Sequence, residues 1–176
     1  WIGSARDATL FGQQLWGDKG KMVIVTEGEI DALSISKLNN NKFPVVSIKT
    51  GAAGAKKDIQ KELEWLEGFE KVVLCFDQDE PGKKAAIECA KLFSPNKARI
   101  CSLPLKDANE MLVSGKTKEL TDCIWSAKPY RPDGIILGSD IWDEIKKEET
   151  CVTVNYPFEN LNVKTHGLRN GELVTV

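Results

Sequence analysis

Two short acidic motifs follow two apolar runs of this 176-residue chain. Asp77 and Asp79 come directly after KVVLCF, and Glu27 and Glu29 come directly after MVIVT. Carboxylates a few ångströms apart repel one another and so raise one another's pKa. A divalent cation such as Mg²⁺ between them removes the free-energy cost of this repulsion. The two motifs therefore predict a metal-dependent site for phosphoryl or nucleotidyl transfer.

The elements that would position these motifs are short apolar runs separated by amphipathic stretches. Four runs are typical of strands buried on both faces, and they begin at residues 22, 44, 71 and 98: MVIVT, PVVSI, KVVLCF and ARICSLPL. Because strands that alternate with helices form parallel βαβ units, the sequence predicts an α/β, Rossmann-like fold. Its central, mostly parallel four-stranded sheet would be flanked by helices. In such sheets ligands collect beyond the carboxyl ends of the strands, where both acidic motifs lie.

The helices between these strands are predicted from apolar spacing and start signals. After MVIVT, an amphipathic segment would turn Ile30, Leu33 and Leu38 toward the sheet. After PVVSI, a Gly/Ala loop would lead to a helix with Asp58 as its N-cap. After KVVLCF, Pro81 lies near the first position of a further helix.

Shifts in composition divide the chain into four predicted parts. Residues 1–20 show no clear period, residues 21–130 carry the α/β pattern, and the Pro- and Gly-rich segment KPYRPDG marks a boundary. Residues 131–150 would form a linker with a short helix, and residues 151–176 have a β-like pattern. Because the first residue is Trp1, we expect the chain to be a piece of a longer protein.

The spacing of Asp77 and Asp79 would point both carboxylates to the same side of an extended backbone. Mg²⁺ prefers oxygen ligands and is usually bound by one or two carboxylates together with substrate phosphates. The alternative is a polar turn in which Asp79 only caps the following helix. The second acidic motif, at a neighbouring strand end, favours the metal site.

Glu27 follows its strand directly, and Gly28 would permit a sharp turn into the next helix. Glu27 could bind a metal ion or act as a general base toward a hydroxyl. Asp31 would either support the site or only stabilise the N-terminus of that helix. Glu29 is most simply a solvated acid.

Further candidates lie at the same predicted edge of the sheet. Gly51 opens the segment GAAG, which could bind a phosphate together with Lys57, or could be a plain connection. Lys83 and Lys106 would attract polyanions or lie on solvated faces. Asp107, after the fourth strand, is a third acidic position and is predicted to bind metal or substrate.

The composition is that of an ordinary globular domain, with 28% charged and 41% hydrophobic residues. The formal net charge of −2 argues against a globally basic nucleic-acid wrapper but leaves room for a local basic patch. Five cysteines without a CxxC pair and one histidine, His166, match no familiar zinc spacing and favour reduced thiols. Since no apolar run approaches the roughly 18 residues of a membrane span, no membrane partner is predicted.

Together these motifs resemble those of a Toprim domain, the metal-binding catalytic module of bacterial-type primases, type IA and II topoisomerases and some nucleases. The resemblance rests on EGEIDAL, the glycine-containing loop after the second strand, FDQDEPGKKAA and LPLKDANE. It is strongest to the bifunctional DNA primase–helicases of phages and their relative, the mitochondrial replicative helicase. LFGQQLW is similar to the stretch that precedes this fold in those primases, and GELVTV to the strand that leads into the helicase P-loop.

The resemblance implies nucleotidyl transfer, namely RNA-primer synthesis on a single-stranded DNA template. Glu27, Asp77 and Asp79 would be the catalytic residues and, with Asp107, the ligands of two Mg²⁺ or Mn²⁺ ions. A 3′-hydroxyl would attack the α-phosphate of a ribonucleoside triphosphate. The residues that would support the ions or the substrate are Asp31, Gly28, Gly51, Lys57, Lys83 and Lys106.

The resemblance also assigns the predicted parts. Residues 1–20 would end a preceding primase subdomain, 21–130 would be the Toprim domain, 131–150 the linker, and 151–176 the beginning of a helicase domain. The linker helix, over 139–149, would dock on a neighbouring subunit of a ring-shaped helicase. Because the zinc-binding module and most of the basic subdomain are missing from the chain, we expect priming to need the full-length parent. The expected location is the cytoplasm of a host cell, or an organellar matrix.

Two alternatives to a primase stay open. The same fold and ions could cleave DNA as a nuclease, or the domain could be a catalytically silent spacer of a replicative helicase. In some mitochondrial relatives the acidic positions are lost together with priming. Here they are all present, which favours a working site.

Overall fold

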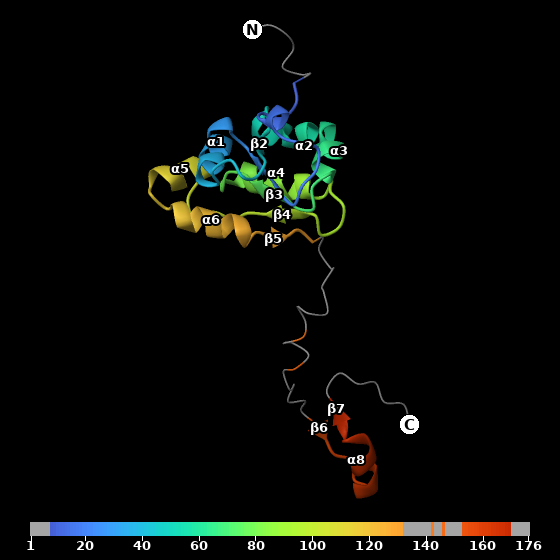
Figure 1. Ribbon diagram of the computed structural model, residues 1–176. Helices are drawn as coiled ribbons and strands as arrows, with labels where there is room; N and C mark the ends of the chain where they lie inside the picture. Colours follow the sequence, from blue (N-terminus) through green and yellow to red (C-terminus); the bar gives the residue numbers. More distant parts are fainter. Residues whose placement is uncertain (1–7, 132–141, 143–145, 147–152, 170–176) are drawn as a thin grey trace. The chain divides into compact units, whose positions relative to one another are not determined.

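The structure is a computed structural model that describes residues 8–131, 142, 146 and 153–169. The chain divides into two units, Trp1–Asp133 and Gly134–Val176. The first unit has a central sheet of five strands in the order β2-β1-β3-β4-β5, with helices around it (Figure 1). This confirms the predicted α/β fold with a mostly parallel sheet, although the sheet has five strands rather than four.

The strands are short, and all but the last run parallel. Their bounds are Val23–Thr26 (β1), Val45–Ser47 (β2), Val72–Cys75 (β3), Ala98–Ile100 (β4) and Lys128–Pro129 (β5). The last strand, β5, lies in the segment predicted as a domain boundary and pairs antiparallel with β4. Pro129 has no N–H to donate, which a strand tolerates at the edge of a sheet. The predicted boundary segment therefore contributes an edge strand.

Two apolar cores lie on the two faces of the sheet, because successive residues of a buried strand point to opposite faces. Val23 and Val25 belong to one core, and Ile24 belongs to the other. Helices α2, α3 and α4 cover the first face (Gly51–Lys61, Leu63–Glu67 and Glu80–Ala90). Helices α1, α5 and α6 cover the second face and gather to the left in Figure 1 (Glu29–Leu38, Ala108–Val113 and Thr117–Trp125).

Helix α1 does not bury the residues that its apolar spacing predicted. Ile30 and Leu33 are 60% and 54% exposed, whereas Ala32, Ser34 and Ile35 are buried. Small side chains allow α1 to lie close to its neighbour α5, and the Ser34 hydroxyl hydrogen-bonds the Oδ1 of Asn109 on that helix. The prediction for Ile30 and Leu33 is therefore wrong, while Leu38 packs against the core as expected.

Helix α2 begins eight residues earlier than predicted, at Gly51 with Thr50 as its N-cap, so Asp58 is not its N-cap. Asp58 lies inside the helix and is buried. Its Oδ2 accepts hydrogen bonds from the amides of Lys49 and Thr50 and from the Thr50 hydroxyl, at 2.8, 3.1 and 2.9 Å. These bonds hold the start of α2 from within, and the predicted Gly/Ala loop is the first turn of the helix.

The segment before β1 covers the outer edge of the sheet. It contains the 3-10 helix η1 (Gln13–Leu15), and Leu10 is fully buried in the core. Phe11 forms an antiparallel bridge with Ser47 of β2, with N···O distances of 3.0 and 3.2 Å. A sheet edge that would otherwise offer free backbone groups is thus paired.

The second unit contains a two-stranded antiparallel sheet of Thr153–Val154 (β6) and Leu168–Arg169 (β7). Helix α8 (Glu159–Thr165) lies between these strands in the sequence, so the β-like prediction for this part missed a helix. The predicted linker helix over 139–149 lies mostly outside the described residues. No helix among the described residues is long and apolar enough to cross a membrane.

Candidate metal centre

The two acidic motifs leave the sheet side by side. Strands β1 and β3 are parallel neighbours, and the last pair in their register is Thr26 with Cys75. Glu27 and Asp77 therefore follow strand ends at the same edge, although fifty residues separate them in the sequence. This edge is the carboxyl end of the sheet, where ligands of α/β folds collect.

Glu27 is held in place by only one of its carboxylate oxygens. Its Oε1 accepts a hydrogen bond from the amide of Ala52 at 2.9 Å, in the first turn of α2. Its Oε2 is buried and has no hydrogen-bond partner among the described residues. A buried carboxylate oxygen without a partner is costly, and a bound cation would remove that cost.

Two glycines shape the backbone around Glu27. Gly51, at the start of α2, has a φ of +64°, which glycine adopts without strain. A Cβ here would lie 3.7 Å from Oε1 of Glu27, an ordinary van der Waals distance, so the positive φ is what favours glycine at this position. At Gly28 a Cβ would meet Oδ2 of Asp31 at 2.9 Å. Gly51 is therefore favoured by its backbone conformation, and Gly28 by the closeness of the Asp31 carboxylate.

Asp77 has the most perturbed acidity at this edge. Burial, together with the negative charges of Glu27, Asp31 and Asp107, raises its pKa to about 6. Lys106 opposes this effect, with its Nζ at 3.7 Å from Oδ2 of Asp77. Four carboxylates from three different loops and one helix thus act on one another electrostatically.

Asp31 links helices α1 and α5. Its Oδ1 accepts a hydrogen bond from the amide of Asn109 at 2.9 Å. Burial raises the pKa of Asp31, that hydrogen bond lowers it, and the charges of Asp107 and Glu27 raise it further. Asp31 therefore has a structural role in addition to its closeness to the other acids.

Asp79 and Asp107 are both helix N-caps. The Oδ1 of Asp79 accepts from the Gly82 amide at 2.8 Å at the start of α4. The Oδ1 of Asp107 accepts from the Glu110 amide at 2.7 Å at the start of α5. The capping role weighed for Asp79 is thus present, and in both residues the other carboxylate oxygen is not used by the cap.

Among the described residues, no three Asp, Glu, His or Cys side chains converge as a ready-made metal cage. Magnesium does not require one, because it usually keeps several waters and binds through one or two carboxylates plus substrate phosphates. The unpartnered oxygen of Glu27 and the mutual repulsion around Asp77 fit such a partial ligand set.

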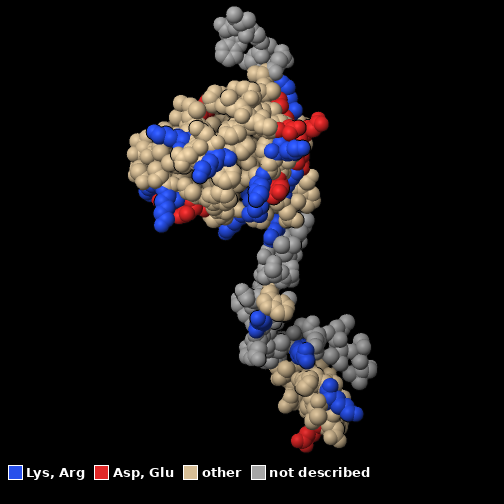
Figure 2. Space-filling view, in the orientation of Figure 1, with Lys and Arg blue, Asp and Glu red and all other residues tan. Residues whose placement is uncertain are grey.

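Basic side chains surround the acidic edge. Lys83 lines a hollow of about 220 Å³ together with Asp77 and Gln78, and Lys57 is exposed on α2. The backbone of Lys106 accepts a 2.8 Å hydrogen bond from the Gln78 amide. On the face of the first unit turned toward the viewer in Figure 2, Lys and Arg are more frequent than Asp and Glu. Local positive charge therefore exists despite the net charge of −2.

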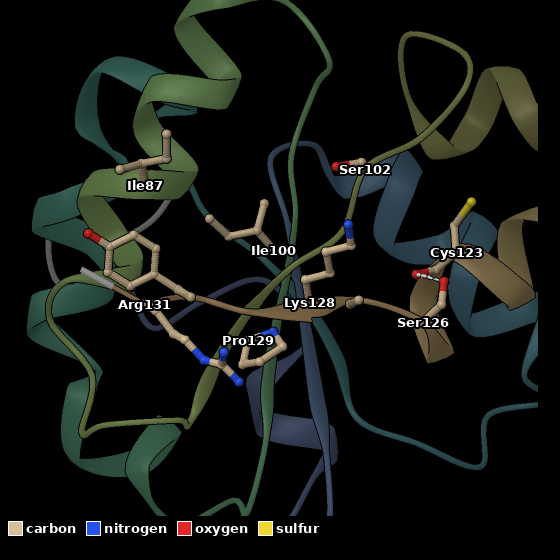
Figure 3. A pocket seen from close by; sticks show the side chains of 10 residues that line it. Ile87, Ile100, Ser102, Cys123, Ser126, Lys128, Pro129 and Arg131 are labelled. Carbon is tan, nitrogen blue, oxygen red and sulfur yellow. Dashed lines mark hydrogen bonds between the residues drawn. The ribbon is translucent and has the colours of Figure 1, made fainter. Parts of the chain in front are cut away.

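A larger hollow of about 550 Å³ adjoins this one and shares Ile87, Ile100 and Ser102 with it. Figure 3 shows it between α4, which carries Ile87, and α6, which carries Cys123. Lys128 of β5 also lines the hollow. The shared residues mean that open space continues from the acidic edge along β4 toward β5.

Two buried thiols lie directly behind the acidic edge. A hydrogen bond with Cys101 raises the pKa of the Cys75 thiol, and burial raises it further. Both residues belong to the apolar core on the α1 side of the sheet and are free cysteines, as the sequence predicted. The Cys75 thiol therefore stays neutral and adds no charge to the core behind the carboxylates.

The sequence did not indicate three of the contacts that organise this edge. The Ala52 amide orients Glu27, the Asn109 amide orients Asp31, and Asp58 fixes the start of α2. Backbone donors carry no residue-type signal, and the pattern around Asp58 suggested a helix start. At this edge the sequence carried a signal only for the positive φ at residue 51, because that residue is a glycine.

A family model described as Toprim-like matches residues 24–112, which hold both acidic motifs and Asp107. The chain belongs to the Toprim-like family. It is 40% identical to a DNA helicase/primase of Enterobacteria phage T3 over 99% of this chain and 31% of that protein. It is 29% identical to an Arabidopsis thaliana Twinkle homologue, chloroplastic/mitochondrial, over 73% of this chain and 21% of that protein.

Among solved structures, the Toprim-like chain is similar to the primase fragment of the bacteriophage T7 primase-helicase protein. The TM-score is 0.63 at 44% identity, over 66% of this chain and 48% of that one. The chain thus spans about a third of the length of its phage T3 relative and about half of the T7 fragment.

Proposed function

We propose that this chain is the Toprim catalytic part of a DNA primase within a replicative primase–helicase. Its reaction would be metal-dependent nucleotidyl transfer that builds an RNA primer on single-stranded DNA. The observation that carries the proposal is the buried, unpartnered Oε2 of Glu27 at the strand end beside Asp77. The names of the phage T3 relative and of the T7 fragment support the assignment.

Glu27, Asp77, Asp79 and Asp107 would hold the metal, with Asp31 and Gly28 beside them. Mg²⁺ or Mn²⁺, as two ions, would neutralise charge on the nucleotide phosphates and activate the attacking hydroxyl. Asp77 would release its proton when a cation binds, because a carboxylate must be ionised to act as a ligand. Its raised pKa makes this release pH-dependent near neutrality.

The remaining residues would position the substrate. The Ala52 amide fixes the direction of the Glu27 carboxylate, and the positive φ of Gly51 lets α2 begin beside it. Lys83 at the hollow and Lys106 beside Asp77, with Lys57 on α2, would attract the triphosphate of an incoming ribonucleotide. The protein part of the reaction is then mainly positioning and electrostatic stabilisation.

The proposed partners are a single-stranded DNA template, ribonucleoside triphosphates and neighbouring subunits of a ring-shaped helicase. Because the chain spans 31% of its phage T3 relative, the test uses the full-length parent. Single-stranded DNA, labelled ribonucleotides and Mg²⁺ are incubated with the wild type, Glu27→Gln and Asp77→Asn. We expect oligoribonucleotides from the wild type and a loss of at least about a hundredfold in both variants, the upper range for residues that support a metal.

Asp122→Asn, an exposed acid on α6, is the matched control and should leave synthesis unchanged. Shortened DNA without labelled oligoribonucleotides would instead show a nuclease. Equal Mn²⁺ binding by the wild type and Asp77→Asn in isothermal titration, without synthesis by either, would indicate a catalytically silent spacer.

A further inference from the structure

A third hollow lies at the opposite edge of the sheet from the candidate metal centre. Its volume is about 380 Å³. Lys21 precedes β1, Lys71 precedes β3 and Arg99 belongs to β4, and all three line it. Because these strands are parallel, the hollow lies at their amino ends, away from Glu27 and Asp77.

Two aromatic rings form one wall of this hollow. Phe43 and Trp125 meet edge to face, with centroids 5.4 Å apart and planes at 81°. Trp125 is nevertheless 57% exposed, whereas its neighbour Ile124 is buried in the core. An indole held in a fixed orientation by a second ring, with much of its surface open, offers a flat face to a ligand.

The charges around the rings are mainly positive. Lys21, Lys71 and Arg99 line the hollow against one acid, Glu70. Neither lysine forms an ion pair with any described residue, and both are exposed. The guanidinium of Arg99 donates from Nη1 to the Ala127 carbonyl at 3.1 Å, while its Nε is buried without a hydrogen-bond partner in the described part of the chain.

We propose that this hollow is a second, non-catalytic binding site for single-stranded nucleic acid. One base stacks on Trp125, and the adjoining phosphates contact Lys21, Lys71 and Arg99. Non-specific single-strand sites combine an aromatic platform with a positively charged surface along the backbone. The volume matches one nucleotide-sized group, since ligand pockets begin at roughly 300 Å³. The site is independent of the metal centre and of the proposed nucleotidyl transfer.

The test measures anisotropy of a fluorescein-labelled oligothymidylate titrated with the 176-residue chain in EDTA, at several salt concentrations. We expect Trp125→Ala to weaken binding at least about fivefold, because stacking contributes roughly 1–3 kcal/mol per base. Trp125→Phe should restore most of the affinity. The affinity falls as salt rises, and the double variant Lys21→Gln/Lys71→Gln should make this dependence weaker. The magnitude of the slope of log K against log salt should decrease by about 1.4, or about 0.7 per lost phosphate contact on a single strand.

Matched controls are Leu33→Ala, an exposed apolar residue on α1, and Lys91→Gln/Lys118→Gln, two exposed lysines outside the hollow. These controls and Asp77→Asn should bind as the wild type does, and melting curves should show every variant folded. The proposal is overturned if Trp125→Ala binds normally or if binding needs a divalent ion and disappears in Asp77→Asn. Equal competition by polyglutamate would also overturn it, since the hollow would then select only negative charge, as a site for an acidic protein partner would.

Discussion

Asp77 carries a charge that the folded chain tolerates poorly in the absence of a cation. Its pKa of about 6 lies above the ordinary value of 3.8, so the folded state binds this proton more tightly than the unfolded state. The resulting stabilisation is fully present below about pH 3.8 and is lost as the pH rises through about 6. The ionised Asp77 carboxylate therefore destabilises the metal-free fold at neutral pH.

We predict that Asp77→Asn melts at a higher temperature than the wild type at pH 7 in EDTA. An amide keeps the shape of the protonated acid without its charge, so the difference should grow between about pH 4 and pH 7. Thermal unfolding followed by circular dichroism across this range checks the prediction, with Asp122→Asn as control. A difference that does not change with pH would contradict it. Added Mn²⁺ should stabilise the wild type but not Asp77→Asn.

Glu27 and Asp77 are coupled, so a change in one should be visible in the titration of the other. We predict that Glu27→Gln lowers the pKa of Asp77 below about 6, because a neighbouring negative charge is removed while the bond from Ala52 can persist. Carboxyl carbon NMR of the metal-free chain would measure this. An unchanged Asp77 pKa would show that the charge of Glu27 does not contribute to its acidity.

At the scale of elements, the start of α2 depends on one buried side chain. Asp58 accepts three hydrogen bonds from Lys49 and Thr50, and the next turn of backbone orients Glu27. We predict that Asp58→Ala costs about 2–4 kcal/mol, because it leaves buried donors without acceptors. Urea unfolding measures the cost. The exposed neighbour Lys57→Ala should cost less than about 0.5 kcal/mol, and similar costs for the two would refute this role for Asp58.

The N-terminus of α4 approaches the backbone of Asp77 closely. A Cβ at Gly82 would lie 2.3 Å from the Asp77 carbonyl oxygen, so the two segments must separate in Gly82→Ala. We predict a loss of stability of about 1–3 kcal/mol together with weaker Mn²⁺ binding. Gly17→Ala is the matched control, since a Cβ there has no neighbour within 4 Å. Mn²⁺ titration calorimetry of both variants distinguishes the outcomes.

The sequence predicted elements well where burial is complete on both faces. Runs such as MVIVT and KVVLCF identified β1 and β3, because a strand inside a parallel sheet has no polar face. Prediction from the sequence failed where contacts between elements decide which residues are buried or which groups they bond. Ile30 and Leu33 look like a core face, but α1 approaches α5 through smaller residues. Asp58 has the residue type of an N-cap, but its partners are eight and nine positions before it.

At the scale of the whole molecule, the order of the strands brings the candidate site together. The sequence indicated that Glu27, Asp77 and Asp107 follow separate strands, and parallel pairing puts those strand ends at one edge. It could not indicate which carboxylate oxygens are already used by Ala52, Gly82 or Asn109. Those bonds depend on helix starts that come from other parts of the chain.

The division of the chain into two units leads to a further prediction. A chain truncated after Asp133 should keep its melting temperature and its stabilisation by Mn²⁺, because the sheet and all the candidate ligands lie in the first unit. Differential scanning calorimetry of both lengths, with and without Mn²⁺, tests this. A large drop in the melting temperature would show that residues after 133 support the sheet.

The bridge between Phe11 and Ser47 has a mechanical consequence. The carbonyl of Ala8 accepts hydrogen bonds from the side chains of Lys49 and Lys61, one before and one at the end of α2. A force on the chain ahead of Ala8 would therefore act on α2, the helix whose first turn orients the Glu27 carboxylate. A displacement of that part of the chain would reach the acidic cluster by two short routes, the bonds from Lys49 and Lys61 and the bridge to β2.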